Sequence, residues 1–460
     1  MRYLLFRSLL LTAMTFALPA VARTGANSSN SQTDIFAPDS TRMYAEEMRR
    51  TELIRNSHVV FMNGDENTRA DRDSAQSLLE KFYVDQFRNS QDPEAPYFTF
   101  MSKDAKLAMG IGGTLALNAW YDWNGMISGA SGLEFSSYLI PVPRTPETTR
   151  QLGASAAAST IFFNLMGLHT PIGEYRAFIE GGFTGFGNKG FKLKKAWFEI
   201  HDFTIGLAKT TFSDPAAQPG VLDQAGANGK VDKTNFLIRY LHTWKNRWTV
   251  AASLEMPNSQ DDGIPDLTEK LPDHVPDIAA LGQYQWHRGM SHVRLAAILR
   301  NFAYRDLVHM QNRHVTGWGI QLSSVVRAGR MVTLYALGSV GKGMSSYTGD
   351  LSNGDFDLLN DTDRPGYFYA PTVVTCTAGA KVQILPKLSS TLCLSTLRNF
   401  AMAGAADDTY KYGQYLAINA VYDLTSRLQA GVEYLAGKRK NCGGESGNAN
   451  RALASLTFSF

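Results

Sequence analysis

The chain has 460 residues, with 45 Lys and Arg against 42 Asp and Glu and a formal net charge of +3. A balance so close to neutrality gives no electrostatic basis for nucleic-acid binding, and no run of basic residues is longer than Lys438-Arg439-Lys440. Only three cysteines occur, which excludes a disulfide-rich scaffold.

The N-terminus has the order of a secretory signal peptide. Arg2 and Arg7 precede the apolar run Leu9 to Leu18, and an Ala-x-Ala sequence ends at Ala22. The alternative, a membrane anchor, needs about 20 apolar residues in a helix, and this run is about half as long. We expect residues 1–22 to be a signal peptide that is cleaved after Ala22.

Residues 23–104 differ in composition from the rest and are expected to form a partly helical periplasmic extension. The pair Asp39-Ser40 is typical of a helix N-cap, and Asp73-Ser74 is another. Three roles remain open for this extension. It could pack under the following domain, mediate contacts between subunits or plug a lumen.

From residue 105 to the end, apolar and polar residues alternate in segments of about ten, the length a tilted strand needs to cross a membrane. In the last segment Ala452, Leu456 and Phe458 alternate with Arg451 and Ser455. The expected strands are 105–122, 156–168, 174–184, 190–200, 203–210, 233–244, 247–256, 278–288, 292–302, 314–326, 331–340, 370–385, 388–398, 412–423, 427–436 and 450–460. Because 156–168 and 190–200 have ambiguous parity, fourteen or eighteen strands remain open beside sixteen.

The connectors fall into two alternating classes. Those at 169–173, 245–246, 289–291 and 386–387 are tight, whereas those at 123–155, 211–232, 257–277 and 341–369 are long. Outer-membrane barrels have short periplasmic turns and long external loops. The pattern therefore predicts an all-β transmembrane antiparallel barrel over 105–460, in which closure leaves no strand edge unpaired.

Aromatic residues cluster at the expected strand ends, where rings form interfacial girdles. The alternative for each ring is core packing. The clusters are Trp120, Tyr121 and Trp123; Tyr240, Trp244 and Trp248; Tyr422 and Tyr434; and Phe458 and Phe460.

The positions of the cysteines argue against a disulfide. If the turn at Pro386 pairs Leu385 with Leu388, Cys376 lies opposite Leu397 rather than Cys393. We expect no disulfide among Cys376, Cys393 and Cys442.

A few segments contain residue types that occur in metal and catalytic sites. The acidic segment from Asp261 to Asp277 is expected to be an ordinary solvated loop, with divalent-cation binding as the alternative. His309 and His314 lack the framework of a zinc site. No Walker A, Gly-x-Ser-x-Gly or Gly-x-Gly-x-x-Gly sequence appears in its required context, so we expect no cofactor, no metal and no catalytic residue.

Three segments resemble the DcaP-like trimeric porin family, which is related to the phosphate-selective porins. They are Ile172 to Gly185 (IGEYRAFIEGGFTG), Phe191 to Asp214 (FKLKKAWFEIHDFTIGLAKTTFSD) and Phe236 to Asn258 (FLIRYLHTWKNRWTVAASLEMPN). The resemblance covers roughly residues 105–460. It implies a homotrimer of sixteen-stranded pores that pass small, often anionic, solutes.

The connector from Thr211 to Asp232 is the third long or external loop of the expected barrel. The resemblance implies that it folds inward to form a constriction with Asp214 and Asp223. A plain surface loop is the alternative.

Charged residues inside strands are the candidates for lining a pore, because a charge facing lipid costs about 2–4 kcal/mol at the midplane. Because apolar residues take the alternate positions of their strands, Arg239, Arg294 and Arg300 are expected to point into the lumen. At least one of the lysines at 192, 194 and 195 is expected to do the same. The alternative for each lysine is a position at the rim of the barrel. The expected basic lining is Lys192, Lys194, Lys195, Arg239, Arg294 and Arg300, and the expected acidic lining is Glu180, Glu199 and Glu255.

The leading interpretation is an outer-membrane pore of a Gram-negative bacterium for passive diffusion of small hydrophilic solutes, with modest anion preference. The alternatives are an outer-membrane barrel hydrolase and a structural or adhesive barrel. Expected partners are outer-membrane lipid and lipopolysaccharide, further copies in a homotrimer, and small anionic or neutral solutes, with no nucleic acid.

Overall fold

The computed structural model describes residues 58–62, 98–102, 107–125, 127, 133–171, 173–185, 190–245, 247–261, 263, 266–287, 290–402 and 404–460. The expected signal peptide and both expected helical segments lie outside the described residues. Within the described ranges, no helix is long and apolar enough to cross a membrane. Helical structure there is confined to single 3-10 turns, at Ser137–Leu139, Pro146–Thr148, Pro215–Ala217, Ser345–Tyr347 and Leu351–Asn353.

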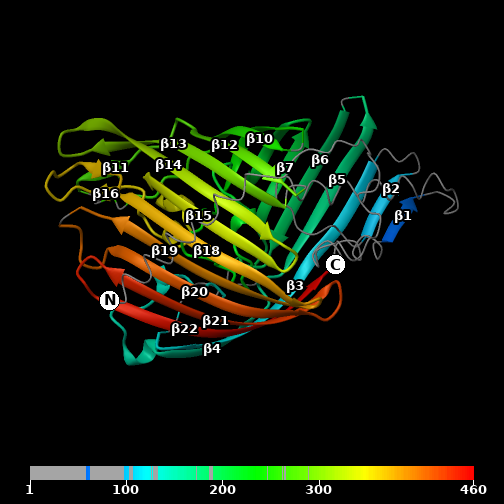
Figure 1. Ribbon diagram of the computed structural model, residues 1–460. Helices are drawn as coiled ribbons and strands as arrows, with labels where there is room; N and C mark the ends of the chain where they lie inside the picture. The colour runs from blue at the N-terminus through cyan, green and yellow to red at the C-terminus, as the bar shows by residue number, and fades with distance from the viewer. Residues whose placement is uncertain are drawn as a thin grey trace, which may run out of the picture.

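Sixteen antiparallel strands close into one barrel, which confirms the predicted fold (Figure 1). One of the sixteen is interrupted: β4 and β5 both pair with β3 and form two parts of a single barrel strand. The strands are β3 (Leu107–Trp123), β4 (Arg150–Ser155) with β5 (Thr160–Thr170), β6 (Gly173–Gly182), β7 (Lys192–Ile200), β8 (Phe203–Lys209), β9 (Thr234–Trp244), β10 (Trp248–Glu255), β12 (Asp277–Trp286), β13 (Ser291–Asp306), β14 (Gln311–Ala328), β15 (Val332–Lys342), β18 (Thr372–Leu385), β19 (Leu388–Phe400), β20 (Tyr410–Asp423), β21 (Leu428–Asn441) and β22 (Ser446–Ser459).

The barrel closes where β22 pairs with β3, in a register that runs from Asn450 opposite Trp123 to Ser459 opposite Thr114. Phe460 and Gly113 extend this ladder with two backbone hydrogen bonds of 2.9 Å each. Closure pairs the backbone groups of both terminal strands, which a sheet surrounded by hydrocarbon requires.

Side chains alternate between an exposed apolar outer face and a buried inner face. On β9, Phe236 and Ile238 are about half exposed, at 52% and 49%, while Leu237 and Arg239 at the alternate positions are buried. The period of two follows from strand geometry, and its apolar half faces outward because the surroundings of a membrane barrel are apolar. Loops that fold into the lumen account for the burial of the inner face.

The two ends of the barrel differ. Turns of a few residues, such as those after β7, β14 and β18, lie at the end where β22 finishes (Figure 1). The long connectors lie at the opposite end and carry the small strands β11 (Thr268–Lys270), β16 (Leu359–Asn360) and β17 (Phe368–Tyr369). The predicted alternation of tight and long connectors is therefore present.

Two strands precede the expected barrel boundary at residue 105. β2 (Phe98–Ser102) pairs antiparallel with β3, and β1 (His58–Met62) pairs parallel with β2. Both strands continue the sheet past the end of β22 along the edge of β3. The division into a signal peptide, an extension over 23–104 and a barrel over 105–460 stays a prediction.

Two details of the predicted side-chain arrangement are wrong. Trp120 points inward and is 5% exposed, because its parity on β3 opposes that of Tyr121, which is 42% exposed. Cys376 lies opposite Thr396 rather than Leu397, because an irregularity between Gln383 and Leu385 shifts the register by one residue. The three cysteines are free thiols.

Most of the other rings proposed for the girdles are exposed on the outer surface, although Tyr434 lies in the middle of β21 rather than at a strand end. They are Tyr121, Tyr240, Trp244, Trp248, Tyr422, Tyr434 and Phe458, and Trp123 and Phe460 are half-buried.

Candidate functional site

The connector between β8 and β9, residues 210–233 and here called loop 3, folds into the barrel and follows its inner wall. Its first anchor is Asp214, whose side chain is fully buried. The carboxylate lies 2.8 Å from Nε2 of His292 on β13 and 3.5 Å from Nη1 of Arg294, and accepts a hydrogen bond from Ser323 on β14. Burial alone would raise its pKa, but Arg294 and His292 outweigh burial and hold the pKa of Asp214 well below its usual range.

The second anchor lies farther round the barrel, at β20 and β21. The buried carboxylate of Asp223 accepts hydrogen bonds from the backbone N–H of Phe135, at 2.9 Å, and from the hydroxyl of Tyr415 on β20, at 3.1 Å. In return, Glu433 on β21 accepts the backbone N–H groups of Leu222 and Asp223, each at 2.8 Å. Loop 3 therefore reaches from β9 to the opposite wall formed by β20 and β21.

The return half of loop 3 is also attached to its surroundings. The backbone N–H of Gly229 donates to Ser395 on β19 at 3.0 Å, and the side chain of Asn228 donates to Ser137 at 3.2 Å. Val231 forms a β-bridge with Thr348 of the connector between β15 and β18. These contacts exclude the alternative of a plain surface loop.

Glu255 at the end of β10 fixes the start of loop 3. Its buried carboxylate accepts hydrogen bonds from the hydroxyl of Thr210 and the backbone N–H of Thr211, both at 2.9 Å, and from Ser253 and Asn235. These donors satisfy the oxygens of the buried carboxylate. Glu255 thus lies on the inner face, as parity predicts, and binds loop 3.

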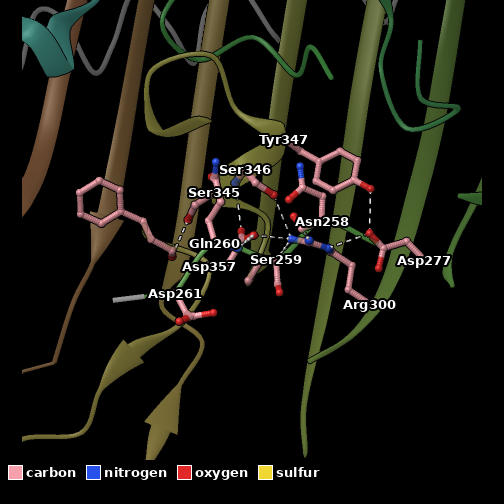
Figure 2. Close-up of polar contacts among 12 residues, drawn as sticks. Asn258, Ser259, Gln260, Asp261, Asp277, Arg300, Ser345, Ser346, Tyr347 and Asp357 are labelled. Atoms are coloured by element: carbon pink, nitrogen blue, oxygen red, sulfur yellow. Dashed lines mark hydrogen bonds and ion pairs between the residues drawn. The ribbon is translucent and has the colours of Figure 1, made fainter. Parts of the chain in front are cut away.

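Arg300 on β13 is the centre of a second buried network (Figure 2). Its guanidinium lies 3.0 Å from Asp277 on β12 and 3.0 Å from Asp357 of the β15–β18 connector. The same group donates to the backbone oxygens of Gly343, at 2.6 Å, and Asn258, at 3.2 Å. One arginine therefore binds the β10–β12 and β15–β18 connectors to the wall.

One aromatic ring and a lysine complete this network. The face of Tyr347 lies 4.9 Å from Arg300 and 4.4 Å from Nζ of Lys233, and its hydroxyl donates to Asp277 at 2.9 Å. Lys233 itself donates to Ser346 at 2.9 Å. Burial, reinforced by the nearby charge of Arg300, lowers the pKa of Lys233 to about 8.

The Arg300→Gln variant tests this network. Asp277 and Asp357 are 1% and 0% exposed as side chains, and removing one partner of a buried ion pair typically costs about 3–5 kcal/mol. We expect the β15–β18 connector to detach, which faster tryptic cleavage after the exposed Arg364 would report. Arg300→Lys should fall between the variant and the wild type; equal cleavage rates in all three proteins would show that Arg300 does not hold the connector.

A basic cluster lies on the part of the wall formed by β6 to β8. Lys195 pairs with Glu180 at 3.0 Å, and Lys209 and Lys230 both pair with Asp232, the latter at 2.9 Å. Lys192, Lys194, Lys195 and Lys209 are close enough to one another to interact electrostatically. Although burial opposes it, Lys230 and Lys209 hold the pKa of Asp232 well below its usual range.

The predicted lining residues thus occupy distinct places. Arg239, Arg294, Arg300, Glu180 and Glu255 are buried on the inner face, Lys194, Lys195 and Glu199 are half-buried, and Lys192 is exposed. The structure brings the three lysines together with Glu180, whereas Arg294 and Arg300 are engaged with loop connectors. A lining role for each residue stays a prediction.

The sequence reasoning missed Lys209, Lys230 and Asp232. On β8 the buried face is taken by Ala208, so the alternation of faces predicts that its neighbour Lys209 points outward. Lys230 and Asp232 lie in a loop, where no period exists. The spacing Lys-x-Asp at 230–232 is the only local hint of their ion pair.

The other candidate sites are accounted for by contacts within the chain. Asp261 lies 3.7 Å from Lys270, and Asp273 accepts a hydrogen bond from Ser259. His309 is bound to Asp306 at 2.8 Å. Across the described ranges, no group of three or more His, Cys, Asp or Glu side chains is arranged to hold a metal ion.

Comparisons with known proteins agree with this architecture. The outer membrane channel DcaP of Acinetobacter baumannii is similar to this chain, with a TM-score of 0.65 and 20% identity over 78% of this chain and 99% of that one. An anion-selective porin from Comamonas acidovorans has a TM-score of 0.51 and 11% identity, over 77% and 100%. At these identities the likeness shows the fold alone.

No curated protein matches the chain in sequence. A family model does: the one described as a porin subfamily matches residues 154–455, which is well over half of the chain. Together with the closed sixteen-stranded barrel, this match places the chain in the Gram-negative outer membrane, with the short turns toward the periplasm and the long loops outside. The chain belongs to the porin subfamily.

Proposed function

We propose that the chain forms a passive, size-limited pore for small hydrophilic solutes with a modest preference for anions. The observation that carries the proposal is the course of loop 3, which folds into the barrel and is bound to the inner wall at β13 and β14 through Asp214 and at β20 through Asp223. A loop held across a lumen narrows it, and the narrowed part has a fixed width because both ends of the loop are attached by buried polar contacts.

The charges beside loop 3 support the anion preference. Five lysines (192, 194, 195, 209 and 230) stand against two carboxylates (Glu180 and Asp232) in this cluster, a local excess of three positive charges. Charges on the wall of a narrow aqueous channel focus the field and raise the concentration of counter-ions. The ion pairs reduce this field, so the preference is modest.

Other parts of the proposal rest on the family resemblance. We infer a homotrimer, which native mass spectrometry in detergent measures.

The residues of the buried networks are saturated by contacts to loops, which supports a channel rather than a hydrolase. An adhesive barrel without a pathway is the remaining alternative.

Liposome swelling tests the proposal. Vesicles that contain the refolded protein should swell in iso-osmotic small sugars, and the rate should fall steeply with sugar size because loop 3 limits the width. Monocarboxylate anions should enter faster than cations of the same size. Rates equal to those of protein-free vesicles for every solute would rule out a pore and favour the adhesive barrel.

A further inference from the structure

Strand β7 is irregular at the point where it carries its lysines. Glu180 of β6 pairs with Lys195, and the next residue of β6, Gly181, pairs with Leu193. Lys194 therefore has no partner on β6 and is the extra residue of a β-bulge. Because a bulge adds one residue to one strand of an antiparallel pair, it changes which face the residues beyond it take.

The side chain of Lys194 lies on the inner face of the barrel. Gly182 of β6 has the same parity as the buried Glu180, and a Cβ atom added to Gly182 would lie 2.7 Å from Cε of Lys194. Lys194 therefore crosses the inner wall over Gly182, where the absence of a side chain leaves room for it. Leu193, in contrast, is 43% exposed among the apolar side chains of the outer face.

A regular strand would orient the same residues in the opposite way. With Lys195 inward and strict alternation, Lys194 and Lys192 would face lipid and Leu193 would face the lumen. The bulge instead leaves Leu193 outside, and it turns Lys192 to the inner side, since Lys192 pairs with the inward Gly182. One extra residue therefore gives this part of the inner wall two cations that a regular strand would turn toward lipid.

The three lysines of β7 differ in how far their charge is neutralised and screened. Lys195 pairs with Glu180 at 3.0 Å, whereas Lys192 and Lys194 form no ion pair within the part of the chain that the structure describes. Lys192 is exposed at the outer end of the strand, where water and salt screen its charge. Lys194 is half-buried, and a partly buried charge is screened much less, so the field of Lys194 is the least reduced of the three.

We propose that Lys194 determines the ion preference of the pore, and that the β-bulge in β7 is the feature that brings it to the lumen. This role rests on the proposed function, whose anion preference it assigns to one side chain and one backbone irregularity. Lys194 interacts electrostatically with Lys209, the last residue of β8, so it lies near the point where loop 3 leaves the wall. A cation without a carboxylate partner at a narrow part of an aqueous channel attracts anions and repels cations there.

The experiment measures reversal potentials of the refolded full chain and its variants in planar bilayers under a gradient of potassium chloride. Lys194→Gln removes the charge and keeps the bulge. Deletion of Lys194 removes both and leaves a regular strand with an unchanged outer face, whereas Lys194→Arg keeps the charge at the bulge. Lys192→Gln removes one charge from the same strand, and Lys387→Gln removes one from an exposed short turn.

We expect the chloride-over-potassium permeability ratio to fall by about twofold or more in Lys194→Gln and in the deletion variant, because the focused field of one cation is lost. The fall should be clearly smaller in Lys192→Gln and near zero in Lys387→Gln, and Lys194→Arg should keep most of the preference.

The outcomes separate this role from the proposed function. An anion-preferring wild type with an unchanged ratio in Lys194→Gln would overturn the role of Lys194 and leave the pore intact. An equal fall in Lys192→Gln or Lys387→Gln would also overturn it, since the effect would then be one of general charge. A deletion variant with the wild-type ratio would show that the bulge does not set the preference. A wild type without current would contradict the proposed pore itself.

Discussion

Asp214→Asn is expected to release loop 3 and to raise the single-channel conductance. The carboxylate is fully buried between His292 and Arg294, and neutralising it leaves the buried Arg294 without its anion at a cost of about 3–5 kcal/mol. The strand ladder is unaffected, so the cost falls on the attachment of the loop. At about 1.4 kcal/mol per factor of ten, the population of detached loop rises by at least a hundredfold.

Ser323→Ala is the matched control for this prediction. It removes one hydrogen bond to the same carboxylate and leaves both ion pairs, so it should cost only about 1 kcal/mol. Conductance and current noise in planar bilayers should increase in the order wild type, Ser323→Ala, Asp214→Asn. An Asp214→Asn channel with wild-type conductance and noise would mean that loop 3 does not set the width.

Reversing the charge of Lys192 and Lys194 together is expected to change the sign of the ion preference. The cluster has five lysines and two carboxylates, 5 − 2 = +3, and two Lys→Glu changes remove four units, which gives −1. Each charge acts within about a Debye length of 10 Å at 0.1 M salt. The reversal potential under a salt gradient should move from the anion side to the cation side, and less at 1 M salt.

Lys245→Glu with Lys387→Glu makes the same change of charge on exposed turns at the periplasmic end and should leave the reversal potential near that of the wild type. Neutralising Arg239, Arg294 and Arg300 together, which strand parity suggests, is a less clean probe. Arg294 binds Ser213 of loop 3, and Arg300 binds Gly343 and Asp357, so the triple variant alters loops as well as charge.

Strand positions were predictable from the sequence because one physical requirement acts along the whole barrel. Lipid on one side and a polar interior on the other impose a period of two on each strand, and the C-terminal segment around Leu456 and Phe458 shows it without exception on its outer face. The same rule correctly turned Arg239, Arg294 and Arg300 inward.

The contacts of the inward residues were not predictable from the sequence. The two-residue alternation along a strand indicates which face a side chain takes, but it does not indicate which loop folds against that face. Asp277 and Asp357 are far from Arg300 in the sequence and meet it only after two connectors fold inward. Likewise, Asp223 meets Tyr415 only because loop 3 reaches from β9 to the opposite wall of the barrel.

Local irregularities in strand register explain two of the remaining errors. The register shift at Gln383 moves the partner of Cys376 by one residue, and a second shift at Glu180 changes the parity of β7 in the middle of the lysine run. Such bulges leave little trace in a single sequence. Trp120 was misplaced because an aromatic residue at a strand end fits both an interface and an interior, where it lies 5.2 Å from Arg451.

In the proposed function, loop 3 and the lysine cluster together make an open pore that weakly prefers anions. The most direct measurement is the current of the refolded wild-type protein in a planar bilayer under a tenfold gradient of potassium chloride. We expect a stable open current whose reversal potential has the sign of chloride preference, with a magnitude well short of ideal selectivity. Absence of current at all voltages would contradict the pore, and a reversal potential of potassium sign would contradict the role of the lysines.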